Sequence, residues 1–512
     1  MRQSLFFNKK KLMKKVTKKS TTHSPSSNGN ENIETNINSN DWSSQSSAHL
    51  YQVEQWGEGY FQVDQKGQLC ISPQKDPNGP LIPLVAVVEE ARHASLEFPI
   101  VFRFHDILRQ QVSNLNNTFI RIIGEAQYQG KYTGVYPIKV NQMREVVEEV
   151  LDVGDQFNYG LEAGSKAELL AVLALNKNPQ SLTVLNGYKD TEYLKLAILG
   201  KKLERNVVVV IEKFSELVEL NKLAKEEESI PLIGLRAKLG TRSTGKWSDS
   251  SGDFAKFGLT LPEMMKSIKF LKENNILSET KLFHFHVGSQ IPDIRTIKEC
   301  ITEGARMYAQ LYKMGVPLCY FDVGGGVGIN YDGSKSPTQS SVNYSLQDYI
   351  GDIVYILKEI CDLEGVPHPN IVSESGRLIT AHHSCIITNV FGSINLFEQH
   401  LTNEELTHSK KHHLVKNMHL LLKDLSITNY LDTYNDAVVF KEESSNAFKL
   451  GVINLEDRAT IEHLYWRICH QIIDIIRNLT QVPNELAQLE SLMCDKYLCN
   501  FSDVFCFRHS AI

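Results

Sequence analysis

Residues 134–140, GVYPIKV, form the first of eight short apolar runs along the chain. Each run is rich in β-branched residues and is followed by a stretch with the apolar spacing of a helix. Eight such alternations within about 250 residues match a (βα)8 barrel, and a doubly wound open sheet is the alternative. We therefore predict an α/β fold with a TIM barrel. The other seven runs are residues 158–163, 182–187, 206–212, 232–239, 281–288, 320–324 and 370–375.

The composition is that of an ordinary globular protein. The chain has 512 residues, of which 42% are hydrophobic, and its 54 Lys and Arg against 60 Asp and Glu give a formal net charge of −6. This charge gives no reason to expect nucleic acid as a partner. Nowhere does the sequence reach the roughly 18 apolar residues of a membrane span, so we expect a cytoplasmic protein without a membrane partner. Nine scattered Cys without a CxxC pair suit reduced thiols.

The segments outside the barrel differ from it in composition. Residues 1–47 are first rich in lysine and then in Ser, Thr and Asn, which predicts a disordered tail. Residues 48–83 contain alternating apolar residues punctuated by glycines, which predicts two short strands that begin a β domain. We place the barrel at residues 84–395, a helical domain at 396–492 and a short tail at 493–512.

In a (βα)8 barrel the functional side chains lie at the C-terminal ends of the strands. Lys139 stands at the end of the first run, next to its last residue, Val140. A lysine there can be a plain surface residue, but in a dry pocket it is the natural Schiff-base former. The sixth run carries His284 and His286 on one face, and an HxH pair of this kind also holds metal ions in amidohydrolases. The pair by itself leaves both interpretations open.

Two further strand ends carry groups suited to an anion. Gly324, Gly325 and Gly326 leave backbone N–H groups bare, so that a phosphate can approach closely, although a triple glycine can also be only a flexible turn. Glu374, at the end of the last run, and Arg377, three residues later, belong to a strand-to-helix turn, where a local ion pair explains them equally well in isolation.

Together these strand ends supply the parts of a pyridoxal phosphate (PLP) site. Lys139 would hold the aldehyde, His286 would stack on the ring, and Glu374 would keep the pyridine nitrogen protonated. A carboxylate at that nitrogen makes the ring a strong electron sink, which favours loss of CO2 from an α-carbon. The phosphate would be held by Ser289, Gly324, Gly325, Gly326 and Arg377.

Over about residues 50–505 the chain resembles the biosynthetic arginine decarboxylases of the alanine-racemase-like barrel class. Ornithine and diaminopimelate decarboxylases share the site motifs but lack the Gly-Lys-Trp region and the helical insertion. The resemblance implies a PLP-dependent lyase that turns L-arginine into agmatine and CO2 in putrescine and spermidine synthesis, with Mg2+ and as a homo-oligomer, a dimer or a tetramer. It rests on WGEGYF at residues 56–61, VYPIKVNQ at 135–142, GLEAGSKAEL at 160–169, NGYKD at 186–190, GKW at 245–247, HFHVGSQ at 284–290, DVGGG at 322–326 and ESGR at 374–377.

The resemblance also implies strands beyond residues 495–502 that complete the β domain and carry a proton-donating cysteine, acidic residues that select the guanidinium and a tyrosine on the phosphate. Cys494 and Cys499 do not match that cysteine. We therefore expect a decarboxylase truncated at its C-terminus. An inactive paralogue that acts as a regulatory partner, a decarboxylase of a related basic amino acid, and a metal-dependent hydrolase built on His284 and His286 are the alternatives.

Overall fold

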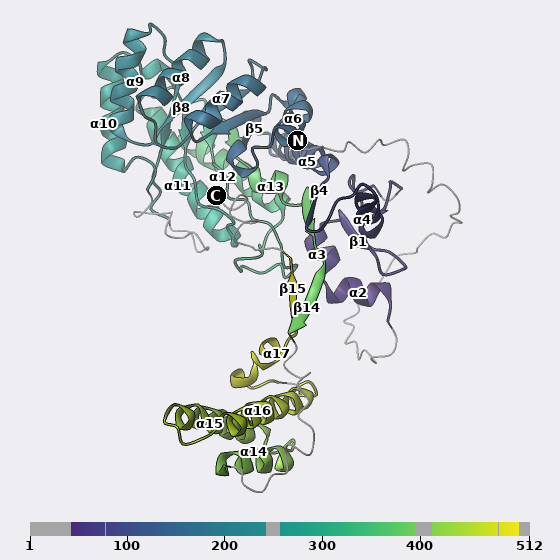
Figure 1. The fold of residues 1–512 in the computed structure, drawn as a ribbon. Coiled ribbons are helices and arrows are strands. Elements are labelled where there is room, and N and C mark those ends of the chain that lie inside the picture. Colours follow the sequence, from purple (N-terminus) through teal and green to yellow (C-terminus); the bar gives the residue numbers. More distant parts are fainter. Residues whose placement is uncertain (1–41, 77, 242–255, 395–411, 480, 501–512) are drawn as a thin grey trace.

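The computed structural model describes residues 42–500 apart from 77, 242–255, 395–411 and 480. Its largest part is a closed barrel of parallel strands surrounded by helices (Figure 1). Because the last strand of the barrel pairs with the first, the sheet is closed, so the predicted (βα)8 barrel is confirmed and the open doubly wound sheet is excluded. The strands are β5 Tyr132–Pro137, β6 Gly160–Ala163, β7 Leu182–Leu185, β8 Asn206–Ile211, β9 Leu232–Arg236, β10 Thr280–His284, β11 Tyr320–Asp322 and β12 Asn370–Ser373.

The strands end earlier than the apolar runs that predicted them. β5 ends at Pro137, which has no N–H to donate to a ladder, and Lys139 lies in the short helix η1 Ile138–Val140 that follows. β10 ends at His284, so His286 lies beyond the strand and not within it. The predicted placement of Lys139 and His286 inside strands is therefore wrong by a few residues. Both residues lie where the chain leaves the barrel wall.

Apolar side chains pack on both sides of the barrel wall. A small core fills the inside, and a larger one joins the strands to the surrounding helices. Since a strand of such a barrel is buried on both faces, it is a continuous apolar run in the sequence rather than an alternating one. The helices are α5 His105–Glu125, α6 Arg144–Gly154, α7 Lys166–Leu175, α8 Thr191–Lys202, α9 Phe214–Glu226, α10 Leu261–Glu273, α11 Ile294–Lys313, α12 Leu346–Glu364 and α13 Gly376–Thr380.

A small sheet lies before the barrel. β1 Phe61–Val63 and β2 Leu69–Ile71 pair as the antiparallel hairpin that the glycines predicted, and β3 Ile82–Pro83 adds a third strand. After α4 Leu84–His93, the chain forms β4 Ile100–Arg103, which pairs with β13 Ser384–Ile387 from the far end of the barrel sequence.

The segment before this sheet is helical, contrary to the sequence prediction. It forms α2 Ser44–Leu50 and α3 Val53–Gly57. α2 begins where it does because Ser43 and Ser46 form a capping box, which satisfies the first free N–H groups of the helix. The predicted tail boundary at residue 47 falls inside α2, and the two strands predicted within residues 48–83 begin only at Phe61. The rest of that tail, residues 1–41, lies outside the described residues.

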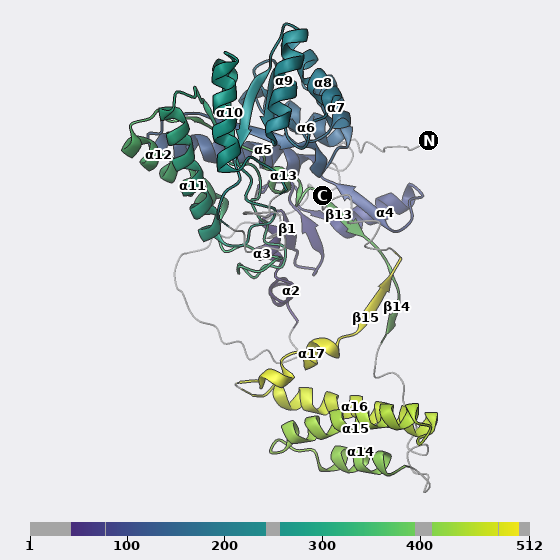
Figure 2. The same ribbon diagram turned by 90° about the vertical axis from the view of Figure 1, so that its left-hand side faces the viewer.

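The C-terminal part is a helical bundle set apart from the barrel. Its helices share an apolar core of their own. An antiparallel ribbon of two strands connects it to the barrel, and both views show the bundle beyond this ribbon (Figures 1 and 2). No helix in the described parts of the chain is long and apolar enough to cross a membrane. The elements are β14 Val390–Ile394, α14 His413–Asp424, α15 Tyr430–Lys449, α16 Leu455–Ile476, α17 Leu489–Leu492 and β15 Lys496–Cys499.

Candidate active site

Lys139 lies beside a buried carboxylate at the C-terminal end of the barrel strands. Its Nζ is 3.3 Å from Oε1 of Glu162 in β6. The glutamate is fully buried, whereas the lysine side chain is 44% exposed. The glutamate carboxylate raises the pKa of Lys139 above that of an ordinary lysine, so its amine is held as an ammonium. The amine is accessible from solvent and has a proton acceptor next to it.

A second buried carboxylate is connected to the first by one amide group. Nδ2 of Asn186 donates to Oε1 of Glu162 at 3.1 Å and to Oε1 of Glu374 at 2.6 Å. Burial raises the pKa of Glu162 to about 7. Burial alone would also raise the pKa of Glu374, but His284, the charge of Lys139 and the hydrogen bond from Asn186 together outweigh it and hold that pKa below its usual range. The site therefore contains one carboxylate that stays ionised and one that titrates near neutral pH.

Two further polar residues surround Glu374 from neighbouring strands. His284 at the end of β10 places Nε2 3.6 Å from Oε1 of Glu374. Asp322 at the end of β11 accepts the N–H of Gly324 at 2.8 Å. Burial, reinforced by the charge of Glu374, raises the pKa of Asp322 well above its usual value. Asp322 thus holds a proton more tightly than Glu374 does.

The turn after β11 is narrow because it consists of glycines. Gly324 and Gly326 have φ angles of +65° and +110°, a region in which other side chains are strained. A Cβ on Gly325 would lie 2.7 Å from the carbonyl oxygen of Glu374. The N–H of Gly325 donates to Nδ1 of His286 at 3.2 Å. Burial lowers the pKa of His286 to about 3, so its ring is neutral and can accept this hydrogen bond.

The guanidinium of Arg377 reaches the loop that follows β10. It donates to Oγ of Ser289 at 3.1 Å and to the hydroxyl of Tyr331 at 3.0 Å. Its Nε is buried and has no hydrogen-bond partner among the described residues. A Cβ on Gly326 would lie 2.6 Å from the carbonyl oxygen of Gly288. Since Gly288 directly precedes Ser289, which Arg377 contacts, the glycine turn lies next to the guanidinium.

The structure brings the predicted site residues together at one end of the barrel. Four polar residues without a predicted role lie among them. Three of these lie in or near the ends of the apolar runs, and a polar residue in a run that is otherwise apolar could have pointed to them. The fourth lies in a long loop, where no sequence pattern pointed to it. They are Glu162, Asn186, Asp322 and Tyr331.

These residues fit PLP. Glycine N–H groups, a guanidinium with a free Nε and a serine hydroxyl suit a phosphate. The carboxylate of Glu374, held ionised, suits a protonated ring nitrogen. The accessible amine of Lys139 suits an aldehyde. The predicted cofactor and the residues found therefore agree in chemistry.

A magnesium ion does not fit the same residues. Mg2+ binds oxygen ligands and keeps several of its waters. Among the residues that the structure describes, the group with metal-like spacing is His284, Asp322 and Glu374, which is fully buried and contains an imidazole. His286 is not part of this group, so the predicted metal pair of His284 and His286 is not found as one ligand set.

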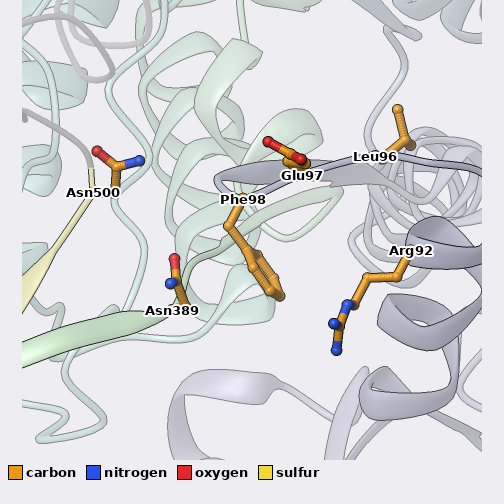
Figure 3. A pocket seen from close by; sticks show the side chains of 6 residues that line it. All are labelled: Arg92, Leu96, Glu97, Phe98, Asn389 and Asn500. Atoms are coloured by element: carbon orange, nitrogen blue, oxygen red, sulfur yellow. The ribbon is translucent and has the colours of Figure 1, made fainter.

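A cavity of about 430 Å3 lies elsewhere, between the loop after α4 and the start of the β14–β15 ribbon. Figure 3 shows Phe98 and Asn389 on its wall, with Arg92 across from them. No predicted site residue lines it. It is lined by Arg92, Leu96, Glu97, Phe98, Asn389 and Asn500.

Comparison with known proteins agrees with the predicted cofactor. Residues 113–381 match the pyridoxal binding domain of pyridoxal-dependent decarboxylases, and residues 408–490 match the arginine decarboxylase helical bundle domain. The motif GKW at residues 245–247 lies outside the described residues.

The similar proteins include two relatives and a solved structure. Biosynthetic arginine decarboxylases of Gloeobacter violaceus and a Synechococcus strain are 44% and 40% identical over 90% of this chain, which spans 71% and 72% of their lengths. The crystal structure of the biosynthetic arginine decarboxylase of Campylobacter jejuni superposes with a TM-score of 0.72 at 31% identity, over 88% of this chain and 72% of that one. The chain therefore belongs to the family of biosynthetic arginine decarboxylases.

Proposed function

We propose that this protein is a PLP-dependent carboxy-lyase that converts L-arginine into agmatine and CO2, a reaction that supplies polyamine synthesis. The names of the relatives support arginine as the substrate. The observation that carries the proposal is the meeting of Lys139, Glu374 and the glycine turn at one end of the barrel.

Each predicted site residue has a task in this proposal. When bound, PLP supplies a ring that can accept the electron pair left on the α-carbon as CO2 departs. Lys139 would hold the cofactor's aldehyde, and Glu374, ionised in this site, would keep the proton on the ring nitrogen. The neutral ring of His286 would lie against the cofactor ring. The phosphate would be held by Ser289, Gly324, Gly325, Gly326 and Arg377.

Glu162 would prepare Lys139 for this role. An ammonium cannot attack a carbonyl, so Lys139 must first lose a proton. The nearby carboxylate of Glu162, 3.3 Å away and with a pKa raised to about 7, can accept that proton near neutral pH. Because Glu162 is buried, its proton is shielded from bulk water while the lysine reacts.

Several broader expectations belong to the same proposal. We place the enzyme in the cytoplasm as a homo-oligomer, a dimer or a tetramer, without nucleic acid or membrane partners. The segment boundaries predicted at residues 83, 395 and 492 remain part of this proposal. The Mg2+ implied by the resemblance has no fitting site among the described residues and is given no role here. Light scattering of the purified protein with and without PLP tests the oligomeric state.

The test of the function is release of labelled CO2 from carboxyl-labelled L-arginine by the purified chain supplied with PLP. Lys139→Ala is the matched control, since it removes the amine and leaves the rest of the site. Release well above this control is expected. Equal traces from both proteins would contradict the proposal and favour a PLP-binding protein with a regulatory role. Faster release from ornithine, lysine or diaminopimelate would retain the chemistry and change the substrate.

A further inference from the structure

Asn186 occupies a fixed position between the two buried carboxylates of the site. It directly follows β7, and its backbone N–H donates to the carbonyl of Ala163 at 3.0 Å. The next residue, Gly187, has a φ angle of +71°, and a Cβ there would lie 2.7 Å from the carbonyl oxygen of Gly164. The N–H of Gly187 donates to Glu212 in the turn after β8. The backbone at Asn186 is thus held from the strands on both sides.

The side chain of Asn186 connects groups from distant parts of the barrel wall. Glu162 belongs to β6, and Glu374 follows β12, with β5 between these strands. Both acceptors are carboxylates, so only the NH2 side of the amide can face them. One NH2 group therefore donates its two hydrogens to two different carboxylates. The Asn186 side chain is buried, and its Oδ1 has no partner among the described residues.

Two carboxylates in one buried pocket oppose each other's ionisation. Each hydrogen bond from a neutral amide favours the charged form of its acceptor without adding a charge of its own. The shorter of the two bonds, 2.6 Å, goes to Glu374, and the longer, 3.1 Å, to Glu162. The amide therefore favours the ionised form of Glu374 more than that of Glu162.

We propose that Asn186 is a positioning residue that keeps Glu374 ionised and aimed at the PLP ring nitrogen while Glu162 remains free to exchange a proton with Lys139. This inference rests on the proposed function, because it assigns Glu374 to the cofactor. It gives a role to Asn186, which begins the NGYKD motif but had no predicted role in the site. Other charged or titratable groups interact with the pair from the surrounding elements, namely Lys139, Glu168, Lys189, His284, His286 and Asp322.

The experiment measures PLP affinity by fluorescence or absorbance titration of the purified chain between pH 5.5 and pH 8.5, without substrate. Asn186→Ala removes both hydrogen bonds, and we expect PLP to bind at least about tenfold more weakly at every pH. Asn186→Asp keeps the shape but adds a third carboxylate, so we expect an even larger loss at pH 8. At pH 5.5 the introduced carboxyl can hold a proton and donate it, so PLP affinity is expected to recover in this variant and not in Asn186→Ala.

Asn116→Ala is the matched control. Asn116 is another buried asparagine of the barrel, but its Nδ2 donates to the carbonyl of Val112 and touches no carboxylate. It is expected to bind PLP as the wild type does. Affinities of both Asn186 variants that equal the wild type, or that fall equally and without dependence on pH, would overturn the proposal, the second outcome indicating a purely structural residue.

The same titration separates this inference from the proposed function. If wild-type protein binds PLP but releases no CO2 from arginine, the proposed reaction fails while the Asn186 variants still test the positioning role. A wild-type chain that binds no PLP would overturn both. Thermal unfolding of each variant in the absence of PLP shows whether a loss of affinity comes from loss of fold.

Discussion

Nζ of Lys139 lies 3.3 Å from Oε1 of Glu162, so that a half-exposed ammonium is paired with a fully buried carboxylate. The pKa values of the two groups differ in what they mean for charge near neutral pH. Lys139 keeps its proton more firmly, whereas Glu162, with a pKa near 7, is the group that changes charge around neutral pH. The rate at which the protein captures PLP should therefore follow the ionisation of Glu162.

Glu162→Gln is expected to slow PLP capture about 100-fold, because the amide cannot take the proton of Lys139. In the wild type the capture rate should rise through pH 7, as Glu162 becomes ionised above that pH. This inflection should disappear in the variant. Stopped-flow absorbance after mixing with PLP measures both effects.

The control for this variant is Glu125→Gln. Glu125 pairs with Arg121 one helical turn earlier in α5, and both side chains are about half exposed to solvent. Its capture rate should match the wild type. A Glu162→Gln protein that keeps both the rate and the inflection of the wild type would show that another group takes the proton.

His286→Asn should reduce the loss of stability on mild acidification of the PLP-free protein. The pKa of His286 is about 6.5 when unfolded and about 3 when folded, because burial disfavours the imidazolium. Between these values the unfolded chain binds more protons, so stability falls as pH falls. As the pH falls from 6.5 to 5, this residue should account for up to about 2 kcal/mol of the loss in unfolding free energy.

Urea unfolding at pH 7 and pH 5 measures this contribution as a difference between two proteins. The wild type should lose more unfolding free energy over this interval than His286→Asn does. Parallel losses in both proteins would mean that His286 is protonated in the folded state, contrary to its burial.

Gly325→Ala should weaken both the fold and the binding of PLP. The added Cβ would lie 2.7 Å from the carbonyl oxygen of Glu374, which is backbone and cannot turn aside. Displacing it should cost about 1–3 kcal/mol of unfolding free energy. The substitution should also weaken PLP binding by at least tenfold, because the glycine turn that would hold the phosphate moves together with the displaced backbone. Chemical denaturation and PLP titration measure the two losses separately.

Gly351→Ala provides the comparison. Gly351 lies inside α12 and has nothing within 4 Å of where its Cβ would be. Alanine is favoured over glycine in a helix interior by roughly 0.5–1 kcal/mol, so this variant should be slightly more stable and bind PLP normally. If the two alanine variants behaved alike, the tight contact at Gly325 would not be a real constraint.

Arg377→Lys should bind PLP about tenfold more weakly than the wild type, although the charge is kept. The guanidinium presents a planar set of donors that already reaches Ser289 and Tyr331, and a lysine ammonium cannot reproduce that fork. Tyr331→Phe removes one of these partners and leaves the guanidinium in place. Tyr331→Phe should weaken PLP binding by less than Arg377→Lys does. The reverse order of affinities would assign the phosphate contact to Tyr331.

Some errors of the sequence analysis have clear physical reasons. Residues 48–83 were predicted to form strands because their apolar residues alternate, yet a serine capping box starts the helix α2 at Ser44, and this helix runs to Leu50. The run that contains Lys139 was predicted as one strand, yet the strand stops at Pro137. In both places a local hydrogen-bonding requirement outweighed the periodicity of the apolar residues.

The sequence by itself determined the barrel and most of the residues at its mouth. Continuous apolar runs followed by helical periodicity reflect strands that are buried on both faces, and residues such as Lys139 and Glu374 stand at the ends of those runs. Only the tertiary structure decided how these ends combine. Strands far apart in the sequence bring Glu162 and Glu374 within reach of a single amide, Asn186. That contact, and the different charge states that burial imposes on the two carboxylates, arise from closure of the barrel and not from any local pattern.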